Sequence, residues 1–534
     1  MPESGGPPES PFAGNDATAA HAAEPSTVRE VEKKLRIHAL FRLPQLAGSV
    51  EGLSAVEPQP TRDLLAVYHD TSDLRLFRWG ITLRRREGGN DAGWHMKLPV
   101  DDEGQGVRDE IRLPLSAGEV GHVPAALSDI VIALTREAPL VPVATLRTER
   151  APYLLSDASG EPTLELVDDT VSVLDADRVV ARFREIEVEA LTPEAATDPL
   201  LGRVVTYLTQ FGAVPSTSSK AATALGPHAS APPDVMSPGT VTPSDAAGGA
   251  VRSHLARHVR RLLIQDVRVR RDAPDSVHQM RVAARRIRSG LRAFSPLVQE
   301  EWARHLRDEL GWVAGELGAA RDTEVMLERL EDRAASLPHD EADLATSAID
   351  KALRARLADA RAHALAALRS ERHRQLLTEL VEAVRSPHLT PESDKPCVDV
   401  LPPLVEKAWI RLAKDVRKLH IDSPAHPWHE TRIAAKKARY AAEAVEPVFG
   451  RPAKRLATGL AEVTEVLGDH QDAYVAQMTL KELAADPDVD GPTGFAIGLL
   501  HALEIEHEMS LRAEFRHLWP TMRRIHDETS LASG

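Results

Sequence analysis

The 534-residue sequence predicts an α+β protein of several domains, in which an antiparallel β-domain precedes an all-α region. From about residue 27 to 190, short segments alternate apolar and polar residues, as half-buried strands do. After residue 249 apolar residues recur at spacings of three and four, which is typical of amphipathic helices. One helical pattern in this second half occurs twice, about 150 residues apart, which predicts a pair of repeated bundles.

The β-domain is expected to contain strands bounded by Gly, Asp or Pro, followed by a helix at about 199–211. The alternation predicts strands at 28–37, 74–86, 94–98, 107–113, 144–155, 163–174 and 179–191. Residues 1–26, rich in Pro, Gly and Ala, are expected to be a disordered leader. The expected limits are 27–224 for the β-domain, 225–249 for a flexible Pro/Ser/Gly-rich linker, and 250–534 for the helical domain, with repeat units at about 250–390 and 400–530.

The composition excludes several classes of protein and site. The single cysteine, Cys397, rules out an intrachain disulfide and a thiolate metal centre. No apolar run reaches the length of a membrane span, and the acidic first residues are unlike a secretory signal. We therefore expect a cytoplasmic protein without a membrane partner. An aromatic content of 4% disfavours nucleic-acid binding, because single strands bind by stacking on aromatic rings.

Charged residues alternate along most of the expected strands, so each strand carries its charges on one face. They are Glu30, Glu32 and Lys34; Arg84 and Arg86; Lys97; Arg108, Glu110 and Arg112; Glu165 and Asp169; and Glu185, Glu187 and Glu189. In one interpretation these faces meet solvent, as in an ordinary half-exposed sheet. In the other they line a closed barrel, where charges must be paired, hydrated or bound to a ligand.

A lumen with a basic wall and carboxylates suits a particular chemistry. Arginine and lysine bind phosphate groups, whereas carboxylates suit Mg²⁺, which keeps several waters and bridges to substrate phosphates. Phosphoryl transfer needs mainly an oriented substrate, neutralised charge and an activated water. The second interpretation therefore predicts a phosphate-binding tunnel.

The same residues, in order, resemble the CYTH or triphosphate tunnel family over about residues 27–224. The resemblance is carried by Glu30-x-Glu32-x-Lys34, Tyr68-His69-Asp70-Thr71, Leu83-Arg84-Arg85-Arg86, Lys97 and the late Glu-x-Glu-x-Glu motif. It implies an eight-stranded antiparallel β tunnel that hydrolyses inorganic or organic triphosphates with Mg²⁺ or Mn²⁺. It also implies catalytic roles for Glu30, Glu32 and Lys34.

The resemblance extends to individual ligands. It implies metal binding by Glu30, Glu32, Asp169, Glu185, Glu187 and Glu189, and phosphate binding by Lys34, Arg84, Arg86, Lys97, Arg108 and Arg150. Asp169 is favoured over Asp168 because it shares the strand phase of Glu165. Arg147 and Arg150 fall on opposite faces, so only one of them is expected to line the tunnel, and Arg150 is favoured.

The repeated helical pattern is a stripe of cationic side chains on one helix face. The first copy is His278, Arg281, Arg285, Arg288 and Arg292, at spacings of 3, 4, 3 and 4, and the second is His429, Arg432, Lys436 and Arg439. Arg252 to Arg292 contain twelve Arg against three acids in a chain whose net charge is −15. Such segregation predicts a polyanion site rather than a solvated face. Each stripe precedes a turn-like sequence that ends at Asp322 or Asp472, and these acids are expected to cap helices or orient a stripe arginine.

The stripes, with the adjacent Arg286 and Lys437, are similar to the signature of CHAD domains: His278-x-x-Arg-Val-x-x-Arg-Arg-x-Arg and His429-x-x-Arg-Ile-x-x-Lys-Lys-x-Arg. The resemblance implies tandem four-helix bundles with a pseudo-twofold repeat and a basic cleft that binds inorganic polyphosphate. It implies polyphosphate contacts from His278, Arg281, Arg285, Arg286, Arg288, Arg292, His429, Arg432, Lys436, Lys437 and Arg439. Polyphosphate granules are then a candidate location.

Three functions stay open on the sequence alone. The first is a metal-dependent triphosphatase joined to a polyphosphate-binding module. The second is a non-catalytic polyphosphate-binding protein, and the third is a class IV type adenylate cyclase, for which no purine-recognising residue is evident. Tripolyphosphate, a nucleoside triphosphate and thiamine triphosphate are all candidate substrates, and the oligomeric state is open.

Overall fold

The structure is a computed structural model that describes residues 26–100, 107–529 and 531. The chain divides into two compact units. The tunnel unit runs up to residue 126 and includes 140–230, and the helical unit consists of 127–139 together with the chain from residue 231 onward. Residues 1–25 of the expected leader lie outside the described residues.

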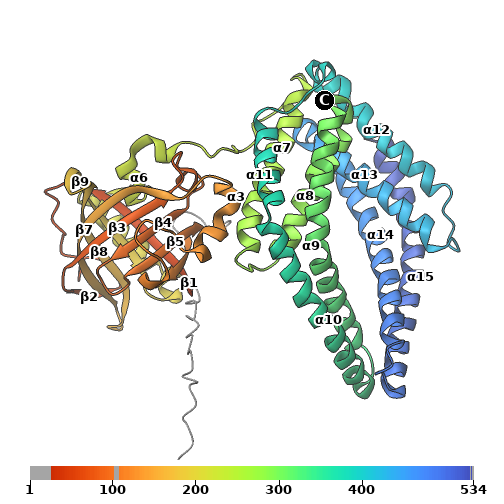
Figure 1. The fold of residues 1–534 in the computed structure, drawn as a ribbon, viewed down its shortest axis with the longest axis horizontal. Helices are drawn as coiled ribbons and strands as arrows, with labels where there is room; N and C mark the ends of the chain where they lie inside the picture. Colours follow the sequence, from red (N-terminus) through yellow and green to blue (C-terminus); the bar gives the residue numbers. More distant parts are fainter. Residues whose placement is uncertain (1–25, 101–106, 530, 532–534) are drawn as a thin grey trace, which may run out of the picture. The chain divides into compact units, whose positions relative to one another are not determined.

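Eight antiparallel strands close into a barrel in the tunnel unit (Figure 1). Their order is β1, β6, β5, β4, β3, β7, β8 and β9, and pairing of β1 with β9 completes the ring. Two further strands extend it, since β2 pairs with β7 and β10 with β1. The predicted eight-stranded tunnel is confirmed. The strands are β1 (Ser26–Ile37), β2 (Leu53–Pro58), β3 (Arg62–Asp70), β4 (Thr82–Glu87), β5 (Gly93–Pro99), β6 (Val107–Leu113), β7 (Val141–Asp157), β8 (Pro162–Asp175), β9 (Arg178–Ala190) and β10 (Val214–Ser216).

The chain between β3 and β4 differs from the prediction of one strand over residues 74–86. It forms the short helix α1 (Arg75–Arg78) before β4 begins. The cause is the buried carboxylate of Asp70, which accepts hydrogen bonds from the backbone N–H groups of Leu76 and Phe77, both at 2.9 Å. These donors have no partner within a helix that has just begun, so a carboxylate placed there favours the turn. Strands β2 and β3 were not predicted by the alternation.

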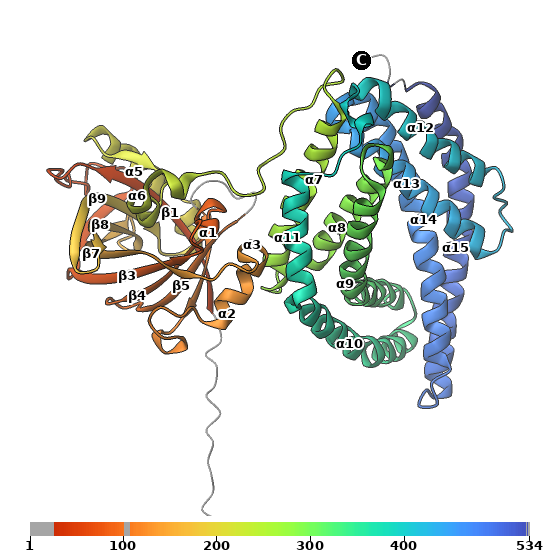
Figure 2. The ribbon, with the colours of Figure 1, turned by 45° about the horizontal axis from the view of Figure 1, so that its top comes forward.

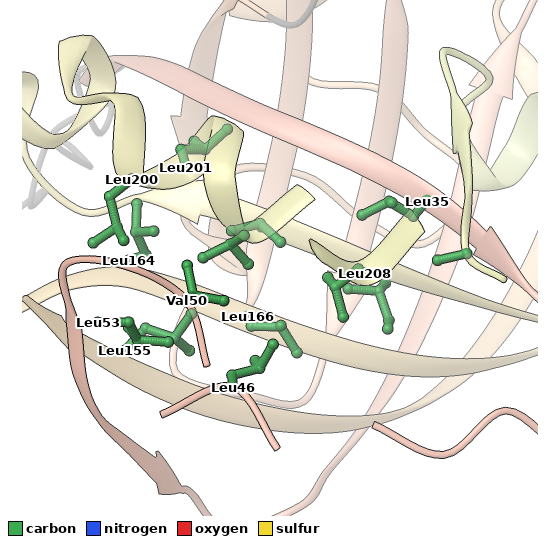
Figure 3. Packing of buried hydrophobic residues seen from close by; sticks show 14 of the residues in the cluster. Leu35, Leu46, Val50, Leu53, Leu155, Leu164, Leu166, Leu200, Leu201 and Leu208 are labelled. Carbon is green, nitrogen blue, oxygen red and sulfur yellow. The ribbon is translucent and has the colours of Figure 1, made fainter. Parts of the chain in front are cut away.

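The apolar core of the tunnel unit lies outside the barrel lumen, between the wall and α5 (Pro199–Gln210) (Figure 3). Leu35 of β1 packs in one cluster with Leu200 and Leu208 of α5. Because successive side chains of a strand point to opposite faces, Leu35 faces this core while Lys34 faces the lumen. Burying the apolar set outside therefore leaves the lumen to the charged set.

The tunnel unit also contains several short helices. These are η1 (Leu115–Ala117), α2 (Ala125–Ser128), α4 (Pro193–Thr197), α6 (Lys220–Leu225) and η3 (Gly226–Ser230), of which α2 spans the division between the units. Ser219 begins α6 as its N-cap, because its side chain accepts a hydrogen bond from the backbone N–H of Ala222 at 3.1 Å.

Long antiparallel helices form the helical unit in two series, α7–α10 and α12–α15, in which each helix packs on the next (Figure 2). The predicted tandem bundles are confirmed, and one further helix, α11, packs on α7 and α9. The helices are α7 (Ala247–Val269), α8 (Ser276–Ala293), α9 (Glu300–Ala334), α10 (His339–Arg369), α11 (Glu371–Arg385), α12 (Cys397–Val416), α13 (Ala425–Phe449), α14 (Arg451–Ala484) and α15 (Gly491–Asp527), with η4 (Ser295–Leu297) and η5 (Pro391–Asp394).

The two turn-like sequences that follow the stripes are not turns. Residues 317–322 lie within α9 and residues 467–472 lie within α14, and both helices continue well beyond them. The glycine in each sequence suggested a break, but a single glycine costs a buried helix only about 1 kcal/mol, which packing outweighs. Asp322 and Asp472 are therefore mid-helix residues rather than caps.

Segment 127–139, which follows β6 and precedes β7 in the chain, belongs to the helical unit. It contains η2 (Asp129–Val131) and α3 (Ile132–Thr135). Asp129 accepts hydrogen bonds from Arg270 at 3.3 Å and Arg369 at 2.8 Å. Residues 231–249, expected as part of the flexible linker, also pack on this unit, since Val235 is fully buried.

Candidate functional site

The barrel holds a charged cavity of about 190 Å³. Nine cationic and seven acidic side chains line it, so neither charge is in large excess. They are Lys34, Arg62, Arg84, Arg86, Lys97, Arg108, Arg112, Arg150 and Lys220, with Glu30, Glu32, Asp91, Glu110, Glu165, Glu187 and Glu189. All the tunnel residues expected from the sequence line this cavity except Asp169 and Glu185, which are buried behind it.

The Glu-x-Glu-x-Lys motif of β1 turns all three charged side chains into the lumen. Glu30 and Glu32 are only 4% and 5% exposed. Lys97 lies 2.5 Å from one carboxylate oxygen of Glu30, and Arg112 lies 2.9 Å from the other. Burial raises the pKa of Glu32, but Lys34 and Lys97 outweigh burial and the net pKa is lowered. Glu32 is therefore held as a carboxylate.

A lattice of ion pairs joins β1, β7, β8, β9 and α6 at one side of the lumen. Glu187 contacts Lys34 at 2.6 Å, Lys220 at 2.8 Å and Arg150 at 3.2 Å. Burial raises the pKa of Glu187, but these three cations outweigh burial and hold the pKa well below its usual value. Asp169 is fully buried and accepts hydrogen bonds from Nε and Nη2 of Arg150 at 2.9 and 2.7 Å.

Register decides the two alternatives that the sequence left open on β7 and β8. Arg150 pairs with Asp169 across these strands and lines the cavity, whereas Arg147 is exposed. Asp168 points to the opposite face, where it contacts Arg184 at 2.7 Å. Arg150 and Asp169 are thus the inward pair.

The opposite wall of the cavity is rich in arginine. Arg84 donates to the hydroxyl oxygen of Tyr68 at 3.4 Å and lies 3.8 Å from Glu110. Burial, followed by the nearby charges of Arg84 and Arg150, lowers the pKa of Arg86 to about 9. An anion would relieve the repulsion that Arg86 meets from Arg84 and Arg150, so this wall suits phosphate.

The helical unit brings its two cationic stripes together where α8 and α13 pack. The guanidinium groups of Arg285 from α8 and Arg439 from α13 both lie over the ring of Tyr440, at 5.7 and 5.3 Å from its centre. A further cross-link joins Arg286 to Glu443 at 3.0 Å. Arg285 and Arg286 of the first stripe and Arg439 of the second therefore meet where the two repeats pack.

Several stripe residues already have partners within the protein. Arg281 donates to Asp322 at 2.9 Å, in keeping with the orienting role expected for that acid. His429 is 2.8 Å from Gln471. Burial lowers the pKa of His278 at the start of α8. Arg292 and Lys437 are exposed.

Comparison with other proteins agrees with this architecture. The CYTH domain model matches residues 28–203, and the CHAD domain model matches residues 253–481. Uncharacterized protein MT2285 of Mycobacterium tuberculosis (strain CDC 1551 / Oshkosh) is 34% identical over 536 residues, covering 95% of this chain and 99% of the relative. The chain belongs to the family of proteins in which a CYTH domain is followed by a CHAD domain.

Two solved structures are similar to part of the chain. PptA from Streptomyces chartreusis is 27% identical, covers 52% of this chain and all of its own, and has a TM-score of 0.45. The CHAD domain from the plant Ricinus communis is 26% identical, covers 53% of this chain and 94% of its own, and has a TM-score of 0.43.

Among the described residues, none of the helices combines the length and the apolar character needed to cross a membrane.

CYTH domains are generally metal-dependent. The carboxylates of Glu30, Glu32 and Glu189 in the tunnel are the candidate metal ligands. Glu189 lies opposite Glu32 in register, and burial followed by the charge of Glu30 raises its pKa to about 7. Within the described part of the chain, no cation lies within ion-pair distance of Glu189. No group of three or more His, Cys, Asp or Glu side chains there is already placed to hold a metal ion. Carboxylates that repel one another fit a divalent cation, which takes oxygen ligands and relieves that repulsion.

Several residues of the CYTH cavity were not assigned roles from the sequence. Lys220 is the most consequential, because it lies 2.6 Å from Glu185 and 3.0 Å from Asp169 as well as contacting Glu187. The only local feature of the sequence that marks the position of Lys220 is Ser219, the N-cap residue directly before it. Glu110 and Arg112 were visible as alternating charges, whereas Arg62 lies on β3, a strand that the sequence did not reveal.

Proposed function

We propose that the CYTH domain hydrolyses a triphosphate with Mg²⁺ or Mn²⁺ and that the CHAD domain binds inorganic polyphosphate. The observation that carries the proposal is the cavity lining, in which nine cationic side chains lie beside seven carboxylates. A site for phosphate alone has no use for the carboxylates, because they repel the ligand. Their presence beside the basic wall favours a reaction over simple anion binding.

The basic wall serves to bind and orient the triphosphate. Arg84 and Arg86 lie two residues apart on β4, and Arg108 on β6 faces the same cavity. Fixed guanidinium groups neutralise the charge that spreads over the phosphate oxygens in the transition state, without reorganisation of water. Lys97 and Lys34 bring the positive charge close to the carboxylates and so set the reacting phosphate beside Glu30 and Glu32.

The carboxylates of Glu30, Glu32 and Glu189 would hold the divalent cation, with Glu187, Glu185 and Asp169 supporting them through Lys34 and Lys220. When bound, such a cation neutralises phosphate oxygens and lowers the pKa of a coordinated water. Glu187 fixes Lys34, since its carboxylate lies 2.6 Å from the lysine ammonium group. The Glu-x-Glu-x-Lys motif would therefore bind both the divalent cation, through its glutamates, and the triphosphate, through its lysine.

The CHAD proposal rests on stripe cations, such as Arg285 and Arg432, that have no ion-pair partner among the described residues. Polyphosphate has dense negative charge and no bases, so it calls for guanidinium and ammonium groups without aromatic platforms. The paired faces of α8 and α13 supply them, and Arg285 and Arg439 both lie over the ring of Tyr440.

The deciding experiment measures phosphate release from tripolyphosphate by the full chain, with and without Mg²⁺ or Mn²⁺. Metal-dependent release that Glu30→Gln/Glu32→Gln loses would support the hydrolase. A matched control is Glu57→Gln/Glu149→Gln, which removes the same charge from exposed positions on β2 and β7. This control is expected to keep wild-type release.

Two other results point to the alternatives. No release with either metal, together with retained polyphosphate binding, would leave a phosphate-polymer binding protein. Cyclic nucleotide formation from ATP in the same assay, without release of inorganic phosphate, would favour the cyclase.

A further inference from the structure

The two CHAD stripes differ at their fifth position. Aligning His278 with His429 places Arg281 on Arg432, Arg285 on Lys436 and Arg288 on Arg439. The next member of the first stripe is Arg292, whereas the same place in the second stripe holds Glu443. The second copy thus ends in an acid where the first continues with a cation.

Glu443 lies among the cations of both repeats. Its side chain is 17% exposed and contacts Arg439 of its own helix and Arg286 of α8, each at 3.0 Å. Arg439 also donates to the hydroxyl oxygen of Thr464 at 2.7 Å and lies over the ring of Tyr440. Arg286 and Arg439 are therefore neutralised and oriented by the protein itself.

Four other stripe cations have no such partners. Within the residues that the structure describes, no carboxylate lies within ion-pair distance of Arg285, Arg288, Arg432 or Lys436. The Nε atoms of the three arginines are buried without a hydrogen-bond partner. Burial and the neighbouring cations lower the pKa values of Arg285 and Arg288 and bring that of Lys436 to about 7. Asp472 acts on Lys436 and Arg432, and Asp308 acts on Arg288, without coming close enough for an ion pair. These four residues are the partly buried cations of the surface that have no ion-pair partner.

We propose that Glu443 is a built-in anionic end-stop, which confines a bound polyphosphate chain to Arg285, Arg288, Arg432 and Lys436 and keeps it from Arg286 and Arg439. This inference rests on the polyphosphate binding proposed above, and it defines where the polyphosphate-binding surface ends. A phosphate placed beside Arg439 meets the carboxylate of Glu443, and the two anions repel because the site is only partly exposed.

The test is the affinity of the full chain for size-fractionated inorganic polyphosphate at fixed pH and salt. Glu443→Gln keeps the size and the acceptor oxygen of the side chain while removing its charge. It is expected to bind polyphosphate about fivefold more tightly, since it releases up to two cations for charge-assisted contacts. Glu430→Gln, an exposed acid on the same helix, is the matched control and should shift affinity by less than about twofold.

A second measurement does not depend on a variant. The logarithm of the binding constant of a polyanion falls with the logarithm of salt by roughly 0.7 to 0.9 for each ionic contact. The end-stop predicts a wild-type slope of about 3 to 4, set by the four unpaired cations, and a steeper slope for Glu443→Gln. A slope near 7 or above for the wild type would mean that the whole stripe is engaged.

The outcomes separate this proposal from the function on which it rests. No polyphosphate binding by the wild type would overturn both. Binding by the wild type, with Glu443→Gln unchanged or weaker, would overturn the end-stop alone and would make Glu443 a residue that positions Arg286 and Arg439 for the ligand. If Glu443→Gln fails to fold, the wild-type slope still decides.

Discussion

Lys220 and Glu185 form a buried ion pair inside the CYTH barrel, with 2.6 Å between the lysine nitrogen and a carboxylate oxygen. Both side chains are 8% exposed. Burial lowers the pKa of Lys220, but Glu185, Glu187 and Asp169 outweigh burial and raise it well above its usual value. One lysine from α6 therefore neutralises carboxylates from two neighbouring strands, β8 and β9.

Replacing Lys220 with Met is expected to destabilise the CYTH domain by about 3–5 kcal/mol, because removing one member of a buried charge cluster leaves the others uncompensated. Arg147→Met, which removes a cation from the exposed face of β7, should cost less than about 0.5 kcal/mol. Hydrogen exchange of β8 and β9 peptides, followed by mass spectrometry, reports the stability of this domain alone. Equal protection in both variants would contradict the prediction.

The apolar cluster outside the barrel gives a second prediction. Leu208 is fully buried on α5, so Leu208→Ala is expected to lower the stability of the CYTH domain by about 3 kcal/mol. Thr206→Ala on the exposed side of α5 is the control. Because the cluster does not line the lumen, the KM for a triphosphate should stay the same in molecules that remain folded. A changed KM at full stability would show that the outer core shapes the cavity.

The two CHAD repeats are joined by a buried carboxylate. Glu504 of α15 is fully buried and accepts from Arg329 of α9 at 2.6 Å and from Arg333 at 3.2 Å. Glu504→Gln is expected to cost about 2–3 kcal/mol, since it weakens hydrogen bonds between charged groups. Glu506→Gln, an exposed neighbour on the same helix, should be neutral within about 0.5 kcal/mol. Urea unfolding of both variants, followed by exchange in α9 and α15 peptides, tests the difference.

Polyphosphate binding is expected to weaken as pH rises through about 7. Burial, then Arg432 and Arg285, lower the pKa of Lys436 to about 7, so a large fraction of this lysine is neutral above that pH. A bound polyanion favours the ammonium form, so the pKa rises on binding and the complex takes up a proton. Affinity should therefore be full below pH 7 and fall as pH rises toward the pKa of the complex.

Lys436→Arg supplies the matched variant, because its guanidinium stays charged over this pH range. It is expected to bind polyphosphate almost equally at pH 7 and pH 9, whereas the exposed Lys437→Arg keeps the wild-type dependence. Calorimetric titrations in buffers of different ionisation enthalpy measure the proton uptake directly. The assignment fails if Lys436→Arg and the wild type show the same slope with pH.

The local periodicities determined much of this protein. Alternation of period two placed Glu30, Glu32 and Lys34 on one face of a strand, and spacings of three and four placed His278 to Arg292 on one face of a helix. Both follow from backbone geometry, in which side chains repeat every two residues in a strand and every 3.6 in a helix. The order of these motifs, and the family resemblance that it carries, predicted the tunnel and the tandem bundles.

Tertiary structure alone decided which charges meet. Lys220 reaches Asp169 from a helix 51 residues away in the chain, and Glu443 reaches Arg286 across 157 residues. Neither contact has a local signal, because closure of the barrel and packing of α8 on α13 bring these residues together. Asp70 likewise converted an expected strand into α1 by binding backbone groups six and seven residues ahead. A charged residue's local pattern shows which face it occupies, but its partner depends on how distant elements pack. That pairing sets which cations remain without an ion-pair partner.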